Sequence, residues 1–147
     1  MPDHTRPSRA SRRSLAAVTL ALAAGAAPAT ADDWPTLRPG LWEYQRTLGA
    51  KQIASKRCLD PVADMKRQNA VLEKNGCAIG PLRQSGSSYT FESTCDMKTP
   101  GGSIRSASVS VMTVESDSAY RLEVRGTMAG EPTSETMTAR RVGDCKP

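Results

Sequence analysis

The chain has 147 residues, with 20 Lys and Arg against 15 Asp and Glu, for a formal net charge of +5. This length predicts a single domain. The first 31 residues hold four of the basic residues and one acidic residue, so residues 32–147 have 16 basic and 14 acidic side chains, a net charge of +2. Such a weakly basic domain gives no support for nucleic acid as a partner.

Residues 1–31 have the pattern of a cleaved export signal. Four arginines precede a short apolar run over residues 15–24, and Ala29-Thr30-Ala31 fits the small-x-small cleavage rule. The run is shorter than the roughly 20 apolar residues that a membrane span needs. We therefore expect cleavage after Ala31 and a periplasmic protein with no transmembrane span. The pair Arg12-Arg13 keeps the twin-arginine export route open beside the general secretory route.

After the signal, the chain opens with two predicted strands. Residues 41–48 alternate, with Trp42 and Tyr44 on one face and polar residues on the other. Gly49 marks a turn, and residues 52–58 can return as a second strand.

One helix is predicted near residues 61–75. Asp60 suits the N-cap position and Pro61 suits the first helical position. Asn75-Gly76 is a typical helix end. A stripe with residues three or four apart can face a core, and it consists of Val62, Met65, Asn69 and Leu72.

The remainder is predicted to be β-structure. Strands over residues 77–83 and 88–95 flank a turn at 84–87, and further strands follow over 104–115, 119–128 and 134–142. Alternating strands have one buried and one wet face. In the strand predicted over residues 104–115, Ala107, Val109 and Val111 lie on one face, and Ser106, Ser108 and Ser110 lie on the other. We expect the apolar face to be the buried one. The fold class is therefore α+β and mainly β, a curved antiparallel meander of six or seven strands with one helix packed on or across it.

Four cysteines, all after the signal, predict two disulfides because an even count in an exported chain is typical of such bonds. Cys77 and Cys95 lie nine residues on either side of Gly86, so a hairpin that turns there places them opposite each other. This pairing leaves Cys58 to bond with Cys145. A zinc site of four cysteines is disfavoured because the spacings lack close Cys pairs.

Several short motifs resemble an exported bacterial family, the domain of unknown function 3617 (DUF3617). The first two are Pro39-Gly40-Leu41-Trp42-Glu43 and Cys58-Leu59-Asp60-Pro61. Cys77 and Cys95 then bracket a hairpin, and the chain ends with Arg140-Arg141-Val142-Gly143-Asp144-Cys145. The resemblance implies an exported, mainly antiparallel domain, and it implies no activity and no functional residues.

Catalysis by histidine is excluded from the mature chain, because the single histidine, His4, lies in the signal. Ser-His-Asp and Cys-His mechanisms therefore need residues that this chain lacks. Four carboxylates remain as acid–base candidates: Glu43, Glu92, Asp96 and Asp144. The alternative is that all four are solvated strand residues or turn formers. We expect no enzyme activity, no cofactor and no metal site.

Two further patterns bear on binding. Five arginines could form a basic strip on the wet face of the sheet: Arg105, Arg121, Arg125, Arg140 and Arg141. The alternative is an ordinary solvated face that acidic residues interrupt. Five methionines could line a pocket for a lipid-like ligand or simply fill the core: Met65, Met97, Met112, Met128 and Met137. The leading hypothesis is a non-catalytic binding or interaction module, with an envelope protein or a small apolar ligand as the partner. The alternative is a carrier of small apolar ligands in a half-barrel pocket.

Overall fold

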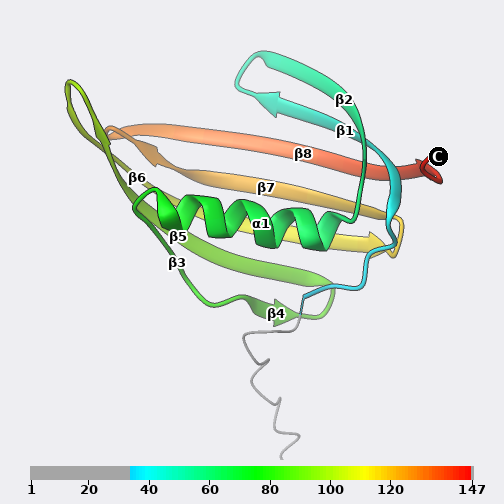
Figure 1. The fold of residues 1–147 in the computed structure, drawn as a ribbon. Helices are drawn as coiled ribbons and strands as arrows, with labels where there is room; N and C mark the ends of the chain where they lie inside the picture. The colour runs from blue at the N-terminus through cyan, green and yellow to red at the C-terminus, as the bar shows by residue number, and fades with distance from the viewer. Residues whose placement is uncertain (1–33, 147) are drawn as a thin grey trace, which may run out of the picture.

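The computed structural model describes residues 34–146, which form one curved sheet with one helix across it (Figure 1). The elements in chain order are β1 (Gly40–Leu48), β2 (Lys51–Leu59), α1 (Pro61–Lys74), β3 (Cys77–Ile79), β4 (Arg83–Ser85), β5 (Ser88–Thr99), β6 (Gly102–Ser116), β7 (Ala119–Met128) and β8 (Glu131–Gly143).

The described strands pair antiparallel in the order β2-β1-β8-β7-β6-β5-β3, and β4 also pairs with β5. The predicted α+β class and the curved antiparallel sheet are confirmed. The strands β5 to β8 form a meander, and the hairpin of β1 and β2 extends this meander beyond β8. The described part has eight strands because the segment predicted as one strand over residues 77–83 breaks at Gly80-Pro81. Proline has no N–H for the ladder, so the strand divides into β3 and β4.

Helix α1 connects the two opposite edges of the sheet, because β2 lies at one edge and β3 at the other. It therefore crosses the concave face (Figure 1). The Asp60 side chain accepts hydrogen bonds from the backbone N–H groups of Val62 and Ala63, at 3.0 and 3.1 Å, and Pro61 occupies the first turn as predicted. Among residues 34–146, no helix is long and apolar enough to cross a bilayer.

The buried core lies under the first turns of α1. Trp42 is fully buried, and its ring centroid lies 5.7 Å from that of Tyr120. Pro61 is also fully buried at the start of the helix, whereas Val71 and Leu72 near its end are exposed. The first turn of α1 is thus packed against the core, whereas side chains near its end are open to solvent.

Strand β6 has the predicted alternation with the opposite face buried. Ser110 is 6% exposed, whereas Val109 is 43% exposed. Ser110 pairs with Val124 of β7, and the neighbouring Met112 pairs with Leu122. Directly paired residues share a face of the sheet, and Tyr120, Leu122 and Val124 face α1. The register with β7 therefore turns the serines inward, and the prediction that the valines are buried was wrong.

The four cysteines form two pairs at disulfide distance. Cys77 and Cys95 are direct partners between β3 and β5. The Cα atoms of Cys58, at the end of β2, and Cys145, just beyond β8, lie 5.6 Å apart. Disulfides usually join Cα atoms about 4.4–6.8 Å apart, a range that includes this pair, whereas the Cα atoms of Cys77 and Cys95 are closer, at 3.9 Å. The bonding of these pairs in the exported protein stays a prediction, and its test is given in the Discussion.

Candidate ligand-binding cavity

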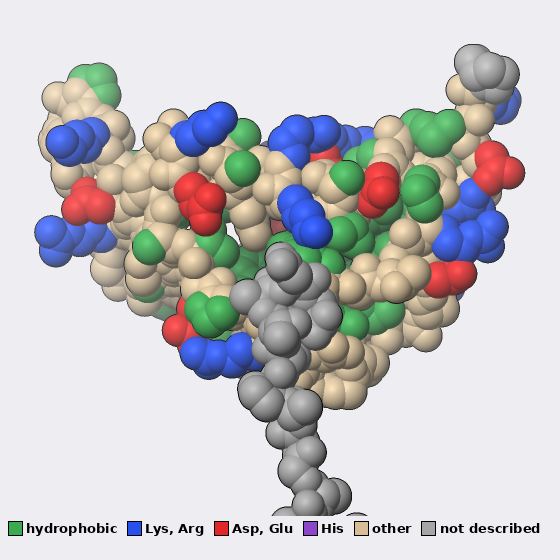
Figure 2. All heavy atoms as spheres, turned by 60° about the horizontal axis from the view of Figure 1, so that its bottom comes forward, with side chains coloured by type: hydrophobic (Ala, Val, Ile, Leu, Met, Phe, Trp, Pro, Cys, Tyr) green, Lys and Arg blue, Asp and Glu red, His purple; other side chains and the backbone are tan. Residues whose placement is uncertain are grey.

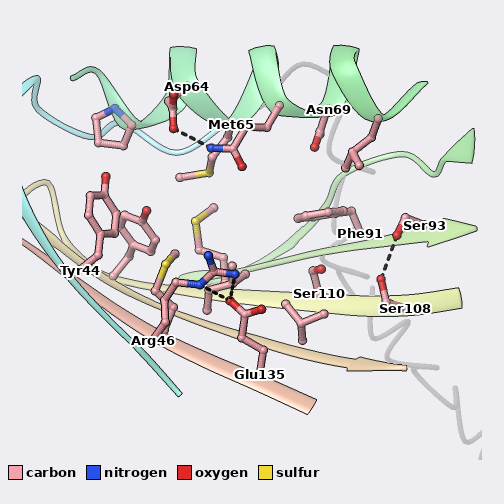
Figure 3. A pocket seen from close by; sticks show the side chains of 18 of the residues that line it. Tyr44, Arg46, Asp64, Met65, Asn69, Phe91, Ser93, Ser108, Ser110 and Glu135 are labelled. Carbon is pink, nitrogen blue, oxygen red and sulfur yellow. Dashed lines mark hydrogen bonds and ion pairs between the residues drawn. The ribbon is translucent and has the colours of Figure 1, made fainter. Parts of the chain in front are cut away.

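A cavity of about 390 Å³ separates α1 from the concave face of the sheet. Known ligand pockets span about 300–1,000 Å³, so the cavity is large enough for a small organic molecule. Figure 2 shows the hollow from the edge where β4 lies, with hydrophobic side chains around it. Figure 3 shows that its walls carry both apolar and polar side chains.

The middle of the cavity is apolar. Met112, Leu122 and Met137 are neighbours on β6, β7 and β8, and Met65 of α1 lies across from the sheet (Figure 3). Three of the five methionines considered from the sequence therefore line the cavity. The other two, Met97 near the end of β5 and Met128 at the end of β7, are not among the lining residues.

A charged group lies where α1 begins. The residue Asp64 is 6% exposed, and its carboxylate pairs with Arg67 and accepts a hydrogen bond of 2.7 Å from the Gln68 amide. The Arg57 guanidinium of β2 also reaches it, at 3.5 Å. Sequence reasoning missed Asp64, although its spacing of three and four residues to Arg67 and Gln68 is typical of helix side-chain pairs.

Two tyrosines, Tyr44 of β1 and Tyr120 of β7, stand on the sheet near this group. Burial raises the pKa of the Tyr120 hydroxyl, and the neighbouring Tyr44 raises it further. Burial also raises the pKa of Tyr44. Both hydroxyls therefore keep their protons well into alkaline solution and can donate hydrogen bonds.

A second ion pair lies on the floor of the cavity. The Nε and Nη2 atoms of Arg46, on β1, each lie 2.7 Å from the Oε1 atom of Glu135, on β8 (Figure 3). The two residues are 89 positions apart in the chain, so no local sequence signal connects them. Sequence analysis identified neither residue.

The far part of the cavity is lined by small hydroxyl residues. The Oγ atoms of Ser93 and Ser108 are 2.9 Å apart and form a hydrogen bond. Ser110 lies beside them, and Phe91 and Asn69 face the same space (Figure 3). Asn69 belongs to the predicted helical stripe, whose members Met65 and Leu72 also line the cavity.

The four carboxylates considered as acid–base candidates are not brought together. Each of them pairs with a different basic side chain, and none lines this cavity: Glu43 with Lys56 at 3.0 Å, Glu92 with Arg83 at 3.7 Å, Asp96 with Arg105 at 3.4 Å, and Asp144 with Arg141. The hydrogen bond from Lys56 and its charge lower the pKa of Glu43.

Four of the five arginines considered for a basic strip share the outer face of the sheet, but acidic side chains interrupt them: Arg105, Arg121, Arg125 and Arg140. Arg121 and Arg125 share Glu123, at 3.0 and 3.8 Å. Arg141 is mostly buried, and its Nε donates a hydrogen bond of 2.8 Å to the Pro39 carbonyl. The alternative of a solvated outer face broken by acidic residues describes this surface better.

Comparison with known proteins gives a family for this chain. Searches of curated proteins and of solved structures each found no match. A family model described as "Protein of unknown function (DUF3617)" matches residues 37–145. The match runs from just before β1 to the last cysteine and covers well over half of the chain. The chain therefore belongs to the DUF3617 family.

Proposed function

We propose that the protein is a non-catalytic binding module of the periplasm, which holds a small amphiphilic ligand between α1 and the sheet. The proposal joins the leading hypothesis from the sequence, a non-catalytic binding module, to its alternative, a carrier of small apolar ligands. The apolar middle of the cavity accommodates a hydrocarbon segment, and the polar groups at its ends bind a polar one. Ligand sites commonly combine such an apolar lining with a few placed polar groups.

The observation that carries the proposal is the reversed face of β6. Burying a valine side chain stabilises a fold by about 1.5–3 kcal/mol relative to leaving it exposed. This strand instead exposes Val109 and turns Ser108 and Ser110 toward the helix. The small serines leave open the space that inward valines would fill, so the strand forgoes stability and keeps a cavity.

A cavity-filling substitution tests the proposal. A neutral fluorescent probe, N-phenyl-1-naphthylamine, should bind the native protein, and the variant Ser110→Leu should bind it at least tenfold more weakly. Leucine adds apolar volume inside the cavity, so this variant should unfold at the same temperature as the native protein or higher. Fluorescence titration and thermal unfolding measure the two effects.

The matched control is Val109→Leu, which changes the adjacent residue on the outer face of the same strand. It should bind the probe as the native protein does. If Ser110→Leu binds as tightly as this control, the cavity is not the site. If the native protein binds no probe, the carrier proposal fails and an interaction module becomes the better hypothesis.

The periplasmic location has its own test, because residues 1–31 lie outside the described residues. N-terminal sequencing of the exported protein should begin at Asp32-Asp33-Trp34, since the signal motif ends at Ala31. A mature protein that retains residues 15–24 would contradict this location. Replacing Arg12 and Arg13 by lysine should block export through the twin-arginine route and leave general secretion intact.

A further inference from the structure

We infer that the ligand of this cavity is an amphiphile with an anionic head group, and that Arg57 binds the head while the tail lies among the methionines. The inference rests on the proposed function and adds the chemical class of the ligand. It follows from three features of the described cavity: how its charges are paired, which of them faces solvent, and how the polar and apolar walls are ordered.

The first feature is the pairing of the charges that line the cavity. The Glu135 carboxylate is held by Arg46 through two nitrogen atoms of one guanidinium. The Asp64 carboxylate is held by Arg67 and by the Gln68 amide. Both anionic groups thus already have an arginine beside them, so a ligand with a cationic head would meet carboxylates whose charge is largely neutralised.

Arg57 differs from the other charged groups because, within residues 34–146, its one hydrogen-bond partner is Asp64, at a long distance of 3.5 Å. A guanidinium has five N–H donors in a planar fork that matches a carboxylate or phosphate. Most of these donors are free for an incoming anion, because only the Nη1 atom of Arg57 has a partner among the described residues. Arg57 is therefore the one lining charge of the described cavity with a large unused binding capacity.

The second feature is the exposure of this arginine. Its side chain is 51% exposed, and it lies on β2, the edge strand that pairs only with β1. Ser55 and Arg57 are two residues apart on β2, so they share the face that lines the cavity. An anion can thus reach Arg57 from solvent without any movement of the buried core.

The third feature is the order of the walls. Ser55 is the direct partner of Tyr44, so Arg57, Ser55 and Tyr44 place donors at one end of the cavity. The next row of the sheet is Met112, Leu122, Met137 and Arg46, and the row beyond is Phe91, Ser110, Val124 and Glu135. When the head group of a ligand is bound at Arg57, its hydrocarbon tail can therefore lie along the apolar side chains of these two rows, beneath Met65 and Leu72.

Competition against bound N-phenyl-1-naphthylamine tests the inference with four ligands of one chain length. Decanoate and decyl phosphate should displace the neutral probe at concentrations at least tenfold lower than decanol or decyltrimethylammonium. Comparison of the two anions distinguishes a carboxylate from a phosphate head. The anionic preference should weaken as ionic strength rises, because Arg57 is half-exposed and therefore screened by salt.

The variant Arg57→Gln should lower the affinity for decanoate about tenfold and bring it to that of decanol. Glutamine keeps a hydrogen-bond donor near Asp64, so the charge is the main loss. The charge reversal Arg57→Glu should make decyltrimethylammonium the better ligand. Arg121→Gln, which removes an arginine from the outer face, is the matched control and should leave all four affinities unchanged.

The outcomes separate this inference from the proposed function. If all four ligands bind with equal affinity, or if Arg57→Gln retains the preference for decanoate, the anionic head group at Arg57 is wrong while the cavity remains the site. If neither the probe nor any of the four ligands binds the native protein, both the inference and the proposed function fail.

Discussion

Replacing Cys58 and Cys145 together by serine should lower the free energy of unfolding by about 4.5 kcal/mol. The two residues are 87 positions apart, and a cross-link that closes a longer loop removes more conformational entropy from the unfolded chain. The bond would also tie the end of the edge strand β2 to the segment after β8. Domains of this size are commonly stable by about 5–15 kcal/mol, so this loss would remove about a third or more of the stability.

The matched control is the pair Cys77→Ser and Cys95→Ser, whose separation is 18. The same chain-entropy argument gives about 3 kcal/mol for this shorter loop. Urea denaturation of the two double variants measures the difference, and peptide mapping without reductant identifies the bonds. A greater loss from the short loop would contradict the entropic ordering. A peptide that links Cys77 to Cys58 or to Cys145 would show that the pairing is wrong.

The predicted Cys58–Cys145 disulfide also bears on ligand binding. Cys58 directly follows Arg57 on β2 and lies two residues before Asp60, which caps α1. Loss of the bond frees the end of an edge strand that only β1 holds in the sheet. We therefore expect the anionic preference to weaken in the Cys58→Ser, Cys145→Ser variant under conditions in which the variant is still folded.

Local signals were sufficient to predict the helix and the central hairpins. Asp60, Pro61 and Asn75 act through contacts within a few residues, so the helix ends follow from the sequence with little help from the rest of the fold. The turn at Gly86 likewise depends on local backbone freedom, because this residue has φ of +59°.

The cavity could not be predicted in the same way because its parts depend on long-range pairing. The inward face of β6 is set by its register with β7, and the alternating pattern alone is equally compatible with either face. Arg46 meets Glu135 because β1 pairs with β8, a contact between the two ends of the described chain. The methionines were identified as candidates, but their arrangement around Leu122 required the strand order.

A second large effect is expected at Trp42. Truncation of this side chain, Trp42→Ala, should lower the free energy of unfolding by about 3–5 kcal/mol, the range typical of a buried aromatic replaced by alanine. The residue is 0% exposed, and its indole Nε1 donates a hydrogen bond of 3.0 Å to the Arg38 carbonyl. The substitution therefore leaves a void beside Tyr120 and also releases the segment that leads into β1.

The second tryptophan of the chain provides the matched control. Trp34 is only partly buried, at the margin of the core, where its ring lies 5.8 Å from the Nζ atom of Lys66. The surroundings of Trp34 are open to water, so the substitution Trp34→Ala leaves a smaller unfilled space. It should lower the free energy of unfolding by less than half as much as Trp42→Ala does. Urea denaturation followed by far-ultraviolet circular dichroism measures both variants without relying on tryptophan fluorescence. Equal losses from the two substitutions would contradict the position of the core under the first turns of α1, since that position makes Trp42 its centre and Trp34 its margin.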